Sequence, residues 1–230
     1  MKLKAIPFIR SFLLVVILNA AISAPAAAEV WADKPLQKVQ ELAQQGDMRA
    51  ERELCIRYAK ALGVEMDLKE AFRWCAKAAD KEDPIAMRNM GLAYLDGKMV
   101  DKDEKRGVEW FQKAAEKGLA RAQYNLGVCY YEGRGIARDY AKAMEWYRRA
   151  SEQGAEKAQR NLGFMLATGK GTAVDLVEAY KWFEIADRLG EPEAAHDRDV
   201  TGRKLSAEQI AHAKNAADDW KPKFEMDYFD

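Results

Sequence analysis

The sequence predicts an all-α protein: an α/α superhelical solenoid of about four 36-residue helix-pair repeats, with capping helices at both ends. Three observations lead to this prediction. Marker residues recur every 36 residues over most of the chain, apolar residues within each interval follow helical spacing, and no strand-like alternation of apolar and polar residues is found. Such pairs are expected to stack, because one pair cannot bury its own apolar face.

The repeat is defined by four windows in register, 50–85, 86–121, 122–157 and 158–193. Each window carries an aspartate and a tryptophan at fixed places. The aspartates are Asp67, Asp103, Asp139 and Asp175, and the tryptophans are Trp74, Trp110, Trp146 and Trp182. Four copies of both residues at one spacing indicate architecture that is repeated, not a single motif.

Each window predicts two helices. In the third, the first helix carries Ala122, Leu126 and Tyr130 on one face, at i, i+4 and i+8. A loop with glycines follows, and Asp139 stands where an N-cap would begin the second helix. We expect Gly127 and its equivalents to let the two helices approach closely. We expect the tryptophan to fill the space between neighbouring pairs.

The segments outside the repeats have their own signals. Residues 1–28 read as a signal peptide, with a basic start, an apolar run and small residues before the expected cleavage after Ala28; an uncleaved anchor is the alternative. Residues 29–49 predict a capping half-repeat. Residues 194–220 predict C-terminal capping helices, with a capping box opening at Ser206, and residues 221–230 a disordered tail.

The composition limits the functional classes. Basic and acidic residues both number 37, so no basic excess indicates a nucleic-acid partner. After the first apolar run no stretch is long enough to span a bilayer, so no stable membrane span is expected after signal cleavage. We therefore expect a periplasmic protein, with full secretion as the alternative.

Motifs for chemistry are weak. Gly133 and Gly135 resemble part of a dinucleotide-binding loop, but Arg138 stands where the third glycine is needed, and the loop follows a predicted helix. The two histidines, His196 and His212, have no metal-like spacing. We expect no catalytic residues, no metal and no cofactor, so the protein is predicted not to be an enzyme.

The unit resembles the Sel-one-like repeat, a relative of the tetratricopeptide repeat. The stretch "AQYNLGVCYYEGRGIARDYAKAMEWYRRASEQGAEKA", from Ala122, follows that pattern almost throughout, and the resemblance covers residues 50–193. It implies a scaffold or adaptor that binds a protein or peptide partner, here in a bacterial cell envelope and possibly in a regulatory role. The alternative is an envelope enzyme or β-lactam-binding protein, like the cysteine-rich branch of the family.

Three cysteines are present. Cys55 stands at the close-packing glycine position and Cys75 beside the tryptophan of the same unit, so the two are expected to face each other. They could form a disulfide in an oxidising compartment or remain two buried thiols. Cys129 lies in another unit and is expected to be a packed free thiol.

The resemblance to peptide-binding tetratricopeptide units also suggests a partner surface on the first helices. There, asparagine can hold a peptide backbone and arginine its carboxylates. The candidate positions are the two residues before the leucine or methionine that recurs in register in three units: Arg88, Asn89, Tyr124, Asn125, Arg160 and Asn161. The alternative is that the asparagines form hydrogen bonds within the repeat.

Overall fold

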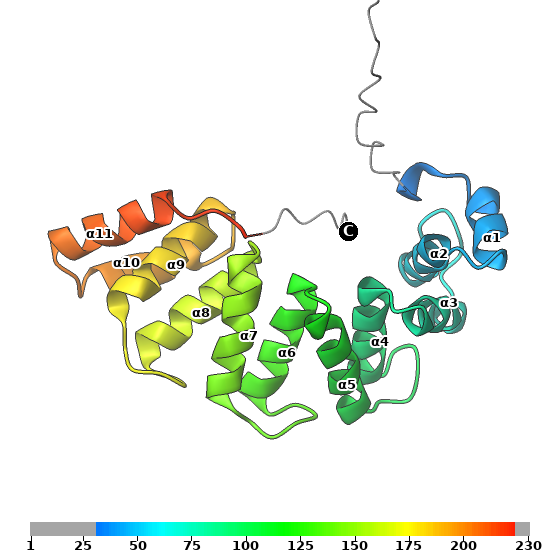
Figure 1. Cartoon of the computed structure of the whole chain (residues 1–230), viewed down its shortest axis with the longest axis horizontal. Helices are drawn as coiled ribbons and strands as arrows, with labels where there is room; N and C mark the ends of the chain where they lie inside the picture. The colour runs from blue at the N-terminus through cyan, green and yellow to red at the C-terminus, as the bar shows by residue number, and fades with distance from the viewer. Residues whose placement is uncertain (1–30, 224–230) are drawn as a thin grey trace, which may run out of the picture. The chain divides into compact units, whose positions relative to one another are not determined.

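A computed structural model describes residues 31–223, and within this range the chain is all helical. Figure 1 shows the helices following one another in chain order. After a short 3-10 helix at Trp31–Asp33, the eleven α-helices of these residues are α1 (Leu36–Gln44), α2 (Met48–Lys60), α3 (Leu68–Asp80), α4 (Pro84–Asp96), α5 (Glu104–Glu116), α6 (Ala120–Glu132), α7 (Tyr140–Glu152), α8 (Glu156–Thr168), α9 (Leu176–Arg188), α10 (Ala194–Gly202) and α11 (Ala207–Asp218).

The packing order is that of a solenoid. The helix pairs are α2 with α3, α4 with α5, α6 with α7 and α8 with α9, and each second helix also packs against the first helix of the next pair. At the ends, α1 packs on α2, and α10 and α11 both pack on α9. The predicted all-α solenoid of helix pairs is confirmed.

The marker aspartates begin the second helices. Asp139 accepts a hydrogen bond from the backbone N–H of Lys142, and Asp67, Asp103 and Asp175 accept equivalent bonds in their own units. A side-chain acceptor here satisfies an N–H that has no partner inside the helix. The regular aspartate therefore fixes where each second helix starts.

The two helices of a pair meet where a glycine faces an aromatic ring. A Cβ placed on Gly127 would lie 2.7 Å from ring atoms of Tyr147. Gly91 faces Phe111 and Gly163 faces Phe183 in the same way. These three rings are almost completely buried, so the glycine makes room for the largest fully buried side chain of the pair.

The expected role of the tryptophans needs a correction. The ring buried between the helices belongs to the residue after the tryptophan. Trp182 is buried, but Trp74, Trp110 and Trp146 are only partly buried against the core. Lys77, Lys113 and Arg149 lie over their rings, three residues further along each helix. A residue one step along a helix points about 100° away, which moves the tryptophan to the edge of the core.

The helices at the two ends of the array are held by contacts of their own. Val39 of α1 stands 36 residues before Cys75 and is fully buried. The predicted capping box is confirmed, since Ser206 and Gln209 exchange both of its hydrogen bonds. Beyond α11, the backbone N–H of Lys223 donates to the Glu152 carbonyl at 2.8 Å. The predicted signal peptide and residues 224–230 of the predicted tail lie outside the described residues.

The cysteines fall into two groups. Cys55 on α2 and Cys75 on α3 are joined by a disulfide across a sequence separation of 20. Both are buried in the contact where other units have glycine and an aromatic ring. Cys129 is a buried free thiol, and burial raises its pKa to about 12.

Candidate functional site

A pocket of about 320 Å³ lies between the first helices of the third and fourth units. The residues of α6 that line it are spaced at i, i+4, i+7 and i+8, so they lie on one face of the helix. The residues of α8 that line it are spaced at i, i+1 and i+4, and α7 contributes the ring of Tyr147. The lining residues are Tyr124, Val128, Tyr131, Glu132, Tyr147, Arg160, Asn161 and Phe164.

The aromatic side chains that line the pocket differ in how exposed they are to solvent. Tyr147 forms its floor as the almost fully buried ring that packs on Gly127. Tyr124 lies over it, with ring centroids 5.9 Å apart. Phe164 is 41% exposed, so part of its ring surface is open to solvent beside the pocket.

The tyrosine hydroxyls stay protonated at neutral pH. Burial raises the pKa of Tyr124, and the carboxylates of Glu191 and Glu132 raise it further. Burial also raises the pKa of Tyr147. The Asn161 side chain lies close enough to both tyrosines to oppose the two pKa shifts. Asn161 of the fourth unit therefore lies beside two tyrosines of the third unit.

Arg160 is engaged by the closing helices. Its guanidinium donates to Asp197 of α10 and pairs with Glu193 at the start of that helix, both at 2.7 Å. These two carboxylates pair with the guanidinium nitrogens that would otherwise bind a peptide carboxylate. The hypothesised carboxylate-binding role does not suit Arg160, because its charge is already compensated within the chain.

The other candidates lie away from this pocket. Asn89 points to the preceding unit, with its amide nitrogen 3.9 Å from Cys55 Sγ, and Arg88 donates to the Asn89 side-chain oxygen at 3.4 Å. The Asn125 amide nitrogen is buried with no hydrogen-bond partner among the described residues. Of the six predicted positions, the structure therefore brings together Tyr124, Arg160 and Asn161.

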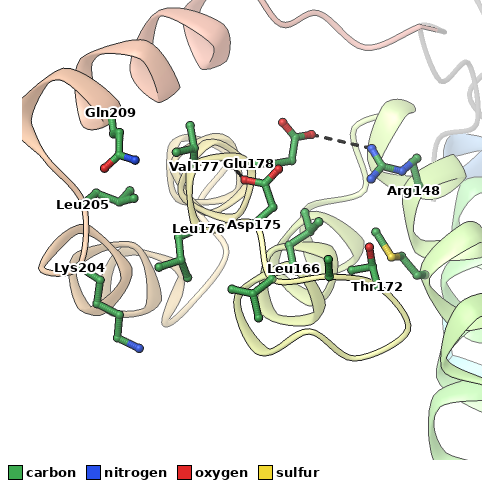
Figure 2. A pocket seen from close by; sticks show the side chains of 13 residues that line it. Arg148, Leu166, Thr172, Asp175, Leu176, Val177, Glu178, Lys204, Leu205 and Gln209 are labelled. Carbon is green, nitrogen blue, oxygen red and sulfur yellow. Dashed lines mark hydrogen bonds and ion pairs between the residues drawn. The ribbon is translucent and has the colours of Figure 1, made fainter.

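A second hollow, of about 810 Å³, opens near the start of α9. Figure 2 shows its side chains coming from α7, α8, the loop before α9, α9 itself, the turn before α11 and α11. Arg148 and Glu178 face each other across one side at 3.8 Å. Asp175, which lines it, is already used as the α9 N-cap. None of the six candidate partner-binding positions lies in this hollow.

The described part of the chain contains no group of three or more histidine, cysteine or acidic side chains that could hold a metal ion. His196 and His212 are exposed and line neither hollow. Among residues 31–223, no helix is both long and apolar enough to cross a bilayer.

Several structural residues were missed from the sequence. Gln123 and Gln159 stand 36 residues apart, and each donates a buried hydrogen bond to a carbonyl near the end of the preceding helix. Their register could have revealed them. Arg52 pairs with the buried N-cap Asp83, and Asp47 stands 36 residues earlier and caps α2 in the same way, so this shorter register could also have been found. Tyr131 and Phe164 were also missed, because neither is repeated in register.

The fold and the pocket define a helical-repeat protein whose exposed features suit contact with another polypeptide. More particularly, the Sel1 repeat family model matches residues 49–83, 84–119, 120–154 and 156–190, and the chain belongs to that family. Sel1 repeats are generally non-enzymatic and act in protein–protein interaction.

Two solved structures are similar. A protective antigen of uropathogenic Escherichia coli strains that displays an SLR fold is 34% identical, with a TM-score of 0.75, over 80% of this chain and 40% of that chain. A Sel1 repeat protein from Oxalobacter formigenes is 28% identical, with a TM-score of 0.68, over 80% and 76%. The chain thus spans less than half of the first relative. A search of curated proteins gave no match.

Proposed function

We propose that this chain is an exported, non-enzymatic scaffold of the bacterial cell envelope that binds a protein or peptide partner. The α6–α8 pocket is its main contact surface. The observation that carries this proposal is the pocket itself, which combines an exposed Phe164, a tyrosine wall and the Asn161 amide on the face formed by first helices. Exposed aromatic groups with a few polar groups around them are typical of protein recognition sites.

Export to the periplasm is the part of the proposal that rests on the sequence. The first 28 residues have the order of a signal peptide, with basic residues, an apolar run and small residues at the expected cleavage site. The Cys55–Cys75 disulfide supports the same compartment, because such bonds persist where thiols are not kept reduced. Full secretion is the alternative destination.

The experiment replaces a side chain by a photo-crosslinking amino acid in the full chain, expressed in cells of the source organism. The test position is Phe164, and the matched control is Leu189, another large apolar residue that is 50% exposed but lies outside both hollows. We expect a discrete crosslinked protein from position 164 and none from position 189. Equal labelling of both positions, or none at 164, would reject the pocket as the contact surface.

A further inference from the structure

The rings around the α6–α8 pocket form the kind of wall that attracts a cation. Tyr124, Tyr131, Tyr147 and Phe164 present aromatic side chains to one small space, and Glu132 adds a carboxylate at its edge. Aromatic faces carry partial negative charge and attract ammonium and guanidinium groups. Four rings and a carboxylate around one small space are therefore suited to binding a positively charged group.

The chain already places one of its own cations against this wall. Lys170 Nζ lies 4.8 Å from the Tyr131 ring centroid and 5.3 Å from that of Phe164. It also donates a hydrogen bond to the Tyr131 hydroxyl, and this bond raises the lysine pKa. Two of the pocket rings thus already hold an ammonium group, although Lys170 itself does not line the pocket.

The surrounding charge favours a cation in the pocket. Of its eight lining residues, only Arg160 is cationic, and Glu193 and Asp197 both pair with it. Glu132 and Glu191 act on the Tyr124 hydroxyl, with Lys157 and Glu156 close to Glu191. With Arg138, which acts on Lys170, these groups are five carboxylates and four cations, a balance that disfavours an acidic side chain.

We propose that this pocket receives a lysine or arginine side chain from an extended segment of the partner protein. The aliphatic stem would lie against Phe164 and Val128, and the charged end would meet the tyrosine rings and Glu132. The inference rests on the proposed function and specifies what the partner must present: a basic residue in an exposed, extended stretch. The volume, about 320 Å³, suits one long side chain and excludes a folded element.

The test uses blocked peptides Gly-Gly-Lys-Gly-Gly and the same peptide with norleucine or glutamate in place of lysine. Binding to the full chain is followed by ¹H–¹⁵N NMR shifts of the Asn161 side chain and of the Tyr131 and Phe164 amides. We expect saturable shifts with lysine and a dissociation constant at least about threefold lower than with norleucine, the lower end of a cation–π effect. Glutamate should not bind.

Variants locate the effect. Glu132→Gln removes the rim carboxylate and Phe164→Leu removes one ring, and both sites are exposed, so the fold should persist. Each should weaken lysine-peptide binding by about threefold. The matched control Glu109→Gln, an exposed glutamate on α5, should leave it unchanged.

Three results would overturn the inference: norleucine binding as tightly as lysine, glutamate binding more tightly, or no peptide shifting these signals. A pocket that prefers norleucine takes apolar side chains instead. If the peptides fail but the photo-crosslink at position 164 still captures a protein, the proposed function survives and only the basic side chain is rejected.

Discussion

Ala61 and Glu82 stand at positions where every other unit has glycine. Ala61 ends α2 with φ of 56°, where Gly97, Gly133 and Gly169 end the later first helices. Glu82 has φ of 66°, where Gly118, Gly154 and Gly190 close the later units. Side chains other than glycine pay for this left-handed conformation, so the first unit stores local strain that the regular units avoid.

Glu82→Gly should therefore stabilise the protein. We expect the free energy of unfolding to rise by about 0.5–1 kcal/mol, because glycine adopts a positive φ without a Cβ penalty. Glu82→Ala is the matched control: it also removes the exposed ion pair with Lys117 but keeps the Cβ, so it should give no gain. Urea titration measures both. A gain from alanine equal to that from glycine would assign the effect to the ion pair instead.

The thiols predict a simple labelling pattern. In the folded, unreduced protein, iodoacetamide at pH 8 should label none of the three cysteines, because Cys55 and Cys75 are bridged and burial raises the Cys129 pKa to about 12. Unfolding without reductant should expose one thiol, and adding reductant should expose three. Intact mass reads the count. Three labelled thiols in unreduced, unfolded protein purified from the oxidising compartment would contradict the disulfide.

At the scale of the helix pair, stability depends on one small residue facing one large ring. Gly127, Gly91 and Gly163 each admit a ring that is almost fully buried, and the first unit replaces this contact by the Cys55–Cys75 disulfide. The sequence predicted the close-packing glycine, since it recurs in register. The residue that fills this contact was predicted wrongly. Tryptophan was expected because it is larger and recurs in every unit, whereas the ring that is buried there is Phe in some units and Tyr in another.

Gly127→Ala should test this contact. The added Cβ would overlap the Tyr147 ring, and overpacking of this kind lowers the free energy of unfolding by about 1–3 kcal/mol. The control is a double-mutant cycle with Tyr147→Leu. We expect the cost of Gly127→Ala to fall in the Tyr147→Leu background, because the clash partner is gone. Additive free energies would show that the destabilisation comes from elsewhere.

For the whole molecule, periodic features could be read from the sequence and single features could not. The 36-residue register revealed the helix pairs and the aspartate caps, because each signal is repeated four times. The pocket depends on Tyr131 and Phe164, which are not repeated. The charge of Arg160 is compensated by Glu193, at the end of the fourth window, and by Asp197 of α10, so its role required the folded structure.

The same contrast explains where a partner should bind. A regular solenoid offers similar surfaces in each unit, and the pocket between α6 and α8 breaks that regularity with an open aromatic wall. The second hollow is larger but more widely open, and it is crossed at one side by Arg148 and Glu178 (Figure 2). We therefore expect partner contact at the smaller, ring-lined pocket.

Position-resolved photo-crosslinking tests this central claim most directly. The three positions to compare are Phe164 at the pocket rim, Val174 in the second hollow and Leu189 outside both, all exposed apolar residues. We predict that a discrete partner is captured from position 164 at well above the yield from 174 or 189. Capture from position 174 with none from 164 would contradict the claim and move the contact surface to the second hollow.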